Sequence, residues 1–447
     1  MKQATLLAAA LMGITAPLRA GAQAVVEPPA LQLTLEAAIE AGLRTSHRLA
    51  ELTARGEAAE AATAERHAAT RPQVAAEAGY TRTNHVDVFA IPVLSTNALR
   101  VIYPDVPNNY RTRLDLQWPI YTSGRYEALE RAARAEWQAS SDDLAAARAD
   151  LRLEITRAYW ALVTAGESLR VVEESVTRID AHLRDVRNQL AVGLVPPNDV
   201  LTVEAQESRQ RLLTIQARTT REVTEAELAR LIGATPGTPI QPAASLDDSL
   251  SADATQALAA LLEQARQQRP ERAALAKRMQ AASERVTAAG AGSKPTIAVG
   301  GGFDYARPNP RIFPREGIWQ DSWDASVNLR WPLFDGGRTR AETAEAAANS
   351  RASGERLAEF DAGLAVELRQ RGSEIESSRA AIEAAGDAVR SATEARRVVG
   401  ERFAAGVATS TDVLDAQIAL LQAELDRTQA IANARLARAR LDRALGR

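Results

Sequence analysis

Apolar residues recur at three- and four-residue spacing through most of the chain, a pattern that predicts amphipathic helices. This spacing covers residues 35–69, 123–190, 199–232, 254–289, 337–404 and 411–445. The segments 123–190 and 337–404 contain no proline, and a helix of that length spans about 100 Å at 1.5 Å per residue. Because this exceeds an ordinary globular domain, we expect both helices to pack along partners in a coiled coil or bundle.

Each long segment is followed by a short loop and a second, shorter helical segment. The loops read VGLVPPNDVL, from Val192, and AGVATSTDVL, from Ala405. Glycine near the end of a helix is typical of a left-handed C-terminal cap. The pattern therefore predicts two helical hairpins, with tips at about 193–199 and 406–412.

Four other stretches alternate apolar and polar residues with a period of two, which predicts strands with one apolar and one polar face. They lie at about 73–84, 111–121, 296–307 and 323–334. In the second stretch, for example, Leu114 and Leu116 alternate with Arg113 and Asp115.

Matching residues recur at constant separations, which indicates an internal duplication. Pairs that stand 213 positions apart are Trp118 and Trp331, Pro119 and Pro332, Gly193 and Gly406, Asp199 and Asp412, Leu201 and Leu414, and Gly233 and Gly446. Upstream, Pro72 and Pro295 stand 223 apart. The first half therefore carries about ten extra residues before Trp118, a difference typical of a surface loop. We expect one repeat at 25–235, a linker at 236–253 and a second repeat at 254–447.

The first 24 residues have the pattern of a secretory signal peptide. Lys2 precedes an apolar stretch, and Ala22-Gln23-Ala24 resembles a cleavage site. The rest of the chain has no apolar run of the roughly 18 residues that a membrane-spanning helix needs. Cysteine is absent, which excludes disulfides and attachment of lipid to an N-terminal cysteine. We therefore expect an exported chain that is not lipidated in this way.

The four strands are predicted to lie in a membrane. A half-buried sheet in a soluble protein would show the same alternation, but strands of about ten residues match a tilted membrane-spanning strand. Thirteen of the nineteen aromatic residues fall in 80–121 or 303–334, as in an interfacial aromatic girdle. Four strands cannot close a barrel, so the chain is expected to oligomerise. Small residues on the polar face, such as Gly300 and Ser326, favour twelve strands from three copies over eight from two.

Two similar motifs, WPIYTSGR and WPLFDGGR, connect a predicted strand to a long helix. Proline cannot donate to a strand ladder, so it is expected to end the strand, and glycine permits a tight turn. The residues assigned to these turns are Trp118, Pro119, Gly124, Trp331, Pro332, Gly336 and Gly337. Thr122 and Asp335 are available to cap the following helices.

No pattern of residues indicates catalysis or a cofactor. The histidines at 47, 67, 85 and 182 are scattered, and His85 with the neighbouring Asp87 is at most part of a metal site. GGR is not followed by the Gly-Lys-Ser/Thr of a phosphate-binding loop. A formal net charge of −3 argues against nucleic acid as a partner.

The two strand-to-helix motifs, the tip GVATSTDVLDAQ, the start LTLEAAIEAGLRTSHRLAEL and the duplication together resemble the TolC-like outer-membrane efflux proteins of Gram-negative bacteria. The resemblance covers nearly the whole chain after residue 24. It implies a trimer with a twelve-stranded barrel in the outer membrane and an α-helical tunnel in the periplasm. Such proteins are exit ducts for tripartite drug efflux or type I protein secretion, and they dock on a periplasmic adaptor driven by an inner-membrane pump.

The hairpin tips hold the candidate functional residues. Asp412 and Asp415 are spaced to share one helical face, and the resemblance implies that they line the periplasmic constriction, with Asp199 at the equivalent of Asp412. Capping of the returning helices is the alternative role for Asp199 and Asp412. The resemblance also implies that the tips meet an adaptor. The residues assigned to this docking surface are Gly193, Leu194, Val195, Gly406 and Val407. We expect the apolar residues among them to be exposed.

Two other functions remain as alternatives. A periplasmic adaptor also has a secreted coiled-coil hairpin, but it would have a single hairpin flanked by β-rich modules. A structural coiled-coil protein of the envelope would need no lipid-facing strands.

Overall fold

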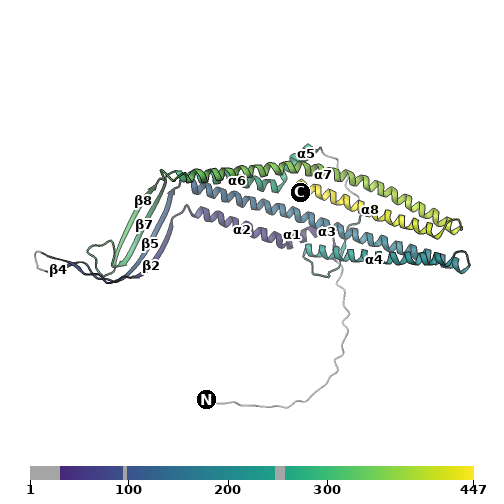
Figure 1. Cartoon of the computed structure of the whole chain (residues 1–447), viewed down its shortest axis with the longest axis horizontal. Helices are drawn as coiled ribbons and strands as arrows, with labels where there is room; N and C mark the ends of the chain where they lie inside the picture. Colours follow the sequence, from purple (N-terminus) through teal and green to yellow (C-terminus); the bar gives the residue numbers. More distant parts are fainter. Residues whose placement is uncertain (1–30, 94–97, 247–256) are drawn as a thin grey trace, which may run out of the picture.

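The structure is a computed structural model that describes residues 31–93, 98–246 and 257–447. The predicted signal segment at 1–24 lies outside these residues. The described chain is elongated, with a sheet at one end and long helices that run away from it (Figure 1). Within the described residues, no helix is both long enough and apolar enough to cross a membrane.

Eight α-helices account for most of the described chain. They are α1 (Leu35–Thr45), α2 (His47–Ala68), α3 (Arg125–Ala191), α4 (Pro197–Ile232), α5 (Leu258–Gln268), α6 (Pro270–Gly290), α7 (Arg338–Ala404) and α8 (Ser410–Ala444). Two segments predicted as single helices are each divided in two. The first break is at Ser46, whose extended backbone ends α1 and whose hydroxyl caps α2 by accepting from the Leu49 amide. The second is at Arg269, which precedes a proline and is therefore biased away from helical geometry.

The duplication is visible in the element bounds. Helices α3 and α7 begin 213 positions apart and end 213 positions apart, at Ala191 and Ala404. Helices α1 and α5 begin 223 apart, at Leu35 and Leu258. Both separations equal those found in the sequence.

The helices form a wall one helix thick (Figure 1). Near the sheet the order across the wall is α2, α3, α6, α7, and toward the tips it is α4, α3, α8, α7. The long helices α3 and α7 therefore run through both levels, while each shorter helix covers one level.

The main sheet contains β2 (Gln73–Arg82), β5 (Asn108–Tyr121), β7 (Thr296–Arg307) and β8 (Gln320–Arg330), in that order and antiparallel throughout. The expected stop at proline is wrong for β5, which continues two residues beyond Pro119 because β7 still pairs with it across a register shift. Strand β8 ends at Arg330, short of the predicted 334, because β7 begins at Thr296 and offers no partner beyond it.

The residues inserted in the first repeat form a hairpin of β3 (Phe89–Pro92) and β4 (Leu99–Tyr103), where the sequence predicts a loop. It projects beyond the sheet on the side away from the helices (Figure 1). At the other end of the sheet the chain passes directly into α3 and α7. A third, parallel pair joins β1 (Leu31–Leu33) to β6 (Ile240–Pro242) beside the helical wall.

The largest apolar cluster lies midway along the helices, around Tyr159 of α3. Its ring is fully buried, and its hydroxyl donates to the Leu33 carbonyl at 3.1 Å and accepts from the Ala244 amide at 3.2 Å. These two bonds attach the β1–β6 pair to α3. A second cluster near the tips joins both hairpins through Ile179, Val203, Phe403 and Val413.

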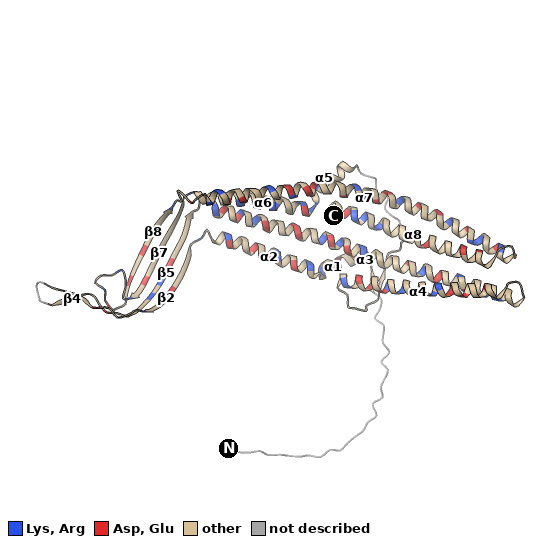
Figure 2. Ribbon diagram, viewed as in Figure 1, with Lys and Arg blue, Asp and Glu red and all other residues tan. Residues whose placement is uncertain are grey.

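Acidic and basic side chains are interspersed along every helix (Figure 2). Many of the ion pairs are exposed and join residues three or four apart on one helix, so each of these contributes little to stability. Arg443 differs from these pairs because its side chain is buried and its partners lie on other helices. Arg443 contacts Asp150 of α3 and Glu271 of α6 and thereby fixes the end of α8 to the wall.

Candidate functional site

The sheet has one apolar and one polar face, as the alternation predicts. The register places Val327 beside Val299, and Phe303 between Leu114 and Trp323, on one face. Side chains on this face are strongly exposed in the single chain: Val74 is 70% exposed and Trp323 is 73% exposed. An exposed apolar face of this size marks a surface that is covered by lipid or by another protein.

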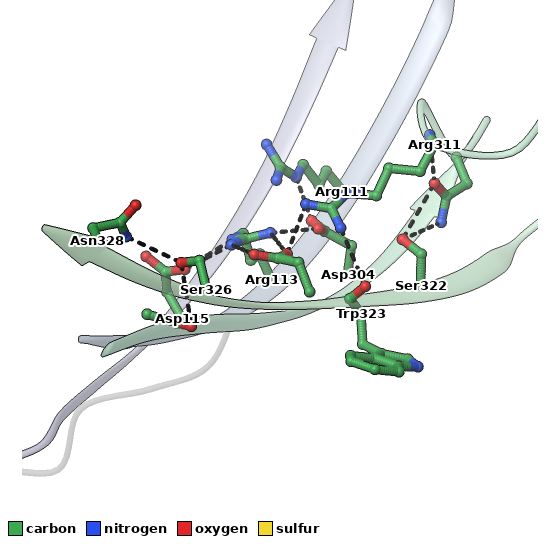
Figure 3. Close-up of polar contacts among 12 residues, drawn as sticks. Arg111, Arg113, Asp115, Asp304, Arg311, Ser322, Trp323, Ser326 and Asn328 are labelled. Carbon is green, nitrogen blue, oxygen red and sulfur yellow. Dashed lines mark hydrogen bonds and ion pairs between the residues drawn. The ribbon is translucent and has the colours of Figure 1, made fainter. Parts of the chain in front are cut away.

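The opposite face carries an ion network that crosses three strands (Figure 3). Asp304 of β7 accepts from Arg111 at 2.6 Å and from Arg113 at 2.5 Å, both on β5. Arg113 also donates to Asp324 of β8 at 3.0 Å and to Asp115 at 2.8 Å. Arg311 completes the network with a 2.7 Å bond to Asp324. Three arginines thus balance three aspartates on the polar face.

Gly302 of β7 allows Arg113 to lie flat on the sheet. A Cβ atom at Gly302 would collide with the guanidinium of Arg113. The absence of a side chain at this position therefore lets the network lie close to the backbone of the sheet. Sequence reasoning placed these residues on one face but missed the network, whose partners are up to 211 residues apart.

The strand-to-helix turns have the expected geometry. Gly124, Gly336 and Gly337 have φ angles of 82°, 67° and 88°, a region that glycine enters without steric cost. Asp335 accepts from the amides of Gly337 at 3.0 Å and Thr339 at 2.9 Å, and so caps α7 as predicted. Thr122 contacts the Tyr126 amide at 3.4 Å in the equivalent position.

Ser123 precedes Gly124 in the first strand-to-helix turn, where the sequence predicts that Ser123 and Gly124 let the backbone turn. It adopts a φ of 54°, which is uncommon for a residue with a side chain. Its hydroxyl donates to the Pro295 carbonyl at 2.6 Å and joins the turn of the first repeat to the start of β7. Trp118 makes a similar link, because its indole nitrogen donates to the Thr70 carbonyl at 3.2 Å. Trp331 and Pro332 lie just beyond β8.

Both hairpin tips end their long helix with a left-handed glycine. Gly193 has a φ of 77° and Gly406 a φ of 72°, and no atom lies within 4 Å of a Cβ built at either. In both tips the next amide bonds back to a carbonyl five residues earlier, Leu194 to Gln189 and Val407 to Arg402, each at 2.9 Å. The two tips therefore have the same backbone structure.

The apolar tip residues differ in exposure. Leu194 is 74% exposed and Val407 is 62% exposed, as expected for a docking surface. The expectation that Val195 is equally exposed is wrong. Val195 is half-buried because it packs against the apolar cluster that joins the two hairpins.

The three tip aspartates have different roles in the single chain. Asp412 forms a capping box with Thr409: its carboxylate accepts from the Thr409 amide at 2.8 Å, and its own amide donates to the Thr409 hydroxyl. These bonds hold the pKa of Asp412 below its ordinary value. Asp199 makes no side-chain cap bond, so the expected capping holds for Asp412 alone. Asp415 is exposed, and its side chain has no hydrogen bond or ion pair among the described residues.

His182 is buried where the two hairpins meet. Its Nε2 lies 3.0 Å from the Ser410 hydroxyl at the start of α8, and its ring packs edge-on against Phe403 of α7. Burial lowers the pKa of His182, while nearby Asp185 and the contact with Ser410 oppose the shift. His85 contacts Asp105 at 2.7 Å rather than Asp87. Within the described residues, no three histidine, aspartate or glutamate side chains are grouped to hold a metal.

The geometry combines a sheet that has one apolar face, an elongated helical wall and two equivalent hairpin tips. A model of the outer membrane efflux protein family matches residues 38–234 and 261–447, which is most of the chain. The chain belongs to the outer membrane efflux protein family. This confirms the resemblance drawn from the repeated motifs, and the two matched segments correspond to the two repeats.

Individual relatives agree with this assignment. The chain is 26% identical over 308 residues to the outer membrane protein TolC of Vibrio cholerae, covering 66% of this chain and 67% of that protein. It is 31% identical over 223 residues to protein CyaE of Bordetella pertussis, covering 49% of this chain and less than half, 46%, of that protein. Its fold is similar to that of the outer membrane protein VceC of Vibrio cholerae, with a TM-score of 0.76 at 21% identity over 92% of this chain and 96% of that one.

As an outer membrane efflux protein, the chain is a channel of the Gram-negative outer membrane that extends into the periplasm and serves as an exit duct. The family match excludes the two alternatives of a periplasmic adaptor and a structural coiled-coil protein.

Proposed function

We propose that three copies of this chain close a twelve-stranded barrel and a continuous helical tunnel, through which substrates leave the periplasm. The observation that carries the proposal is that β2 and β8 each have only one neighbour in the four-stranded sheet. In lipid, the unpaired amides and carbonyls of these edge strands would each cost several kcal/mol. Pairing β8 of one copy with β2 of the next removes every edge.

The helical wall supports the same assembly. Leu212, Ile215 and Val223 of α4 are exposed at one edge of the wall, and Val366 of α7 at the other. Apolar residues along both edges are explained by contact with neighbouring copies. The polar face with its ion network then lines the lumen.

At the periplasmic end, we assign Asp412 and Asp415 to the constriction, with Asp199 nearby on the first hairpin. Three copies bring six carboxylates from Asp412 and Asp415 around one axis, which favours cations. Asp415 suits this role because its side chain forms no hydrogen bond or ion pair with any other residue that the structure describes.

The tips are assigned to docking. Gly193, Leu194, Gly406 and Val407 are exposed on equivalent turns, and a trimer presents six such turns in a ring. Half-buried Val195 supports the turn from beneath. A periplasmic adaptor that presents helical ends of its own fits this ring, and the adaptor in turn requires an inner-membrane pump, either a drug transporter or an ATP-driven exporter.

The assembly is tested on the chain purified from outer membranes in detergent. Mass measured by light scattering should correspond to three copies, and mild amine cross-linking should give dimers and trimers that heat dissociates. The protein should also require detergent to remain soluble. A monomer that is stable in detergent and gives no higher species on cross-linking would contradict the proposal.

A further inference from the structure

The junction between the two repeats provides a template for contact between copies. Inside the chain, β5 of the first repeat pairs with β7 of the second, with Gln117 opposite Gly300 and Arg113 opposite Asp304. The duplication relates β5 to β8 by 213 positions and β7 to β2 by 223 positions. The pair of β8 with β2 of a second copy is therefore the counterpart of β5 with β7.

We propose that β8 pairs with β2 of the neighbouring copy in the register of this internal junction. Moving 213 positions forward from Gln117 reaches Arg330, and moving 223 positions back from Gly300 reaches Glu77. Arg330 of one copy thus lies opposite Glu77 of the next. The inference rests on the proposed trimeric barrel and specifies its register and one ion pair.

The charges of Arg330 and Glu77 favour this register over registers that are shifted by two residues. Arg330 and Glu77 are exposed, and within the described residues neither side chain has an ion pair or hydrogen bond. Opposite charges directly across an antiparallel pair stabilise it. A slip of two residues would place Arg330 opposite Ala75 or Gly79 and leave both charges unpaired.

The two faces of the sheet agree as well. The proposed register puts Ser326 opposite Thr81 on the polar face and Val327 opposite Tyr80 on the apolar face. A slip of one residue would turn every polar side chain of β8 toward the apolar side of β2. The face pattern therefore excludes odd slips, and the charges separate the remaining even ones.

The register also accounts for the early end of β8. In β5, the segment from Trp118 to Tyr121 stays in the sheet because β7 pairs with it. The equivalent residues 331–334 have no partner in the single chain, and Leu333 and Phe334 are 82% and 90% exposed. In the proposed register, residues 74–76 of the next copy supply the missing partners, with the same register shift after Pro332 as after Pro119, so β8 extends to the length that the sequence predicts.

Disulfide cross-linking tests the register directly because the chain contains no cysteine. The variant Ser326→Cys with Thr81→Cys should form covalent trimers on mild oxidation of the assembled protein. Within one chain these positions lie on opposite edges of the sheet, and the register places Ser326 level with Gln73, eight residues from Thr81 along β2. They are therefore about 14 Å apart across the strands and about 27 Å apart along them, so a disulfide within the chain is excluded.

Two matched controls report slipped registers. They are Ser326→Cys with Gly79→Cys, and Asn328→Cys with Thr81→Cys, in which the cysteines would be about 8 Å apart and beyond disulfide reach. We expect at least about tenfold more covalent trimer from the first variant than from either control. Preferential cross-linking of a control would overturn the register. If amine cross-linking finds no trimer in any variant, the proposed assembly itself fails, which is a different result.

Charge exchange gives an independent measurement. Arg330→Glu should lower the temperature at which the trimer dissociates, because two acids then face each other. Adding Glu77→Arg should restore much of the loss by reversing the pair. If the double variant loses as much stability as Arg330→Glu and Glu77→Arg lose together, the two residues are not partners.

Discussion

The guanidinium of Arg113 lies directly over the backbone of Gly302, in the space that a Cβ atom would occupy. From this position it reaches Asp304 and Asp324 on two different strands. A glycine in the middle of a strand normally weakens it. Here the glycine makes room for the residue that joins β5, β7 and β8.

We therefore predict that Gly302→Ala lowers the temperature at which the trimer dissociates, because a Cβ atom here would take the space of the Arg113 guanidinium. The added methyl group displaces Arg113 from its aspartates. Thermal dissociation of the trimer on unboiled gels measures the effect. Gly79→Ala is the matched control, because it stands 223 positions earlier in the other repeat and a Cβ there meets nothing within 4 Å. Equal effects in the two variants would contradict a specific role for the network.

The tip aspartates are separable by mutation. Asp415→Asn should reduce the cation preference of the channel in planar bilayers and leave its thermal stability unchanged, because Asp415 caps nothing. Asp412→Asn should reduce the preference too, and it should also cost about 0.5–2 kcal/mol by weakening the cap of α8. Reversal potentials in a salt gradient measure selectivity. Unchanged selectivity in the double variant would place the constriction elsewhere.

Docking is tested at the two tip glycines. Gly193→Arg and Gly406→Arg place a bulky charge on the tips and should abolish efflux or secretion in cells, while trimers still assemble. Each also forces a left-handed backbone on a residue with a side chain, at a cost of about 1–2 kcal/mol.

Gly237→Arg controls for that strain. Gly237 has a φ of 84° and open space around it, but it lies after α4 and away from the tips. We expect this variant to retain transport. Full drug resistance or export by the two tip variants would show that the adaptor docks elsewhere.

Acid should weaken the contact between the hairpins at His182. Since burial lowers the folded-state pKa of His182, the unfolded chain binds the proton more readily. The stability from the neutral ring is therefore complete above the unfolded pKa of about 6.5. It is lost as pH falls through the folded-state value.

His182→Gln keeps a polar group near Ser410 and removes the titration. Melting temperatures at pH 7 and pH 5 should therefore differ less in this variant than in the native protein. An identical pH dependence would show that protonation of His182 does not limit stability in acid. The charge of nearby Asp185 raises the pKa of this ring, and it remains in both proteins.

Features that repeat along the sequence could be predicted closely. Helices α3 and α7 were predicted at 123–190 and 337–404, within two residues of their observed bounds, because a long apolar period and two glycine-containing turns define them. The four strands were found because their alternation recurs in both repeats.

Features that depend on single residues or on distant partners could not be predicted in this way. The break at Ser46 interrupts a helical period that continues on both sides, and only the capping hydroxyl marks it. The contact of Arg113 with Asp324 depends on strand register, which no local pattern reveals. The sequence predicts an exposed Val195 because it lies in a hairpin tip, yet the cluster beneath the tip buries part of its side chain.

Among the described residues, a hairpin such as that of β3 and β4 occurs in the first repeat and not in the second. The rim of a three-copy assembly would therefore be uneven, because three projecting hairpins would alternate with three segments that have no such hairpin. Any large particle that reaches the cell surface would meet this threefold outline first, whereas the body beneath it is built from six nearly equal units.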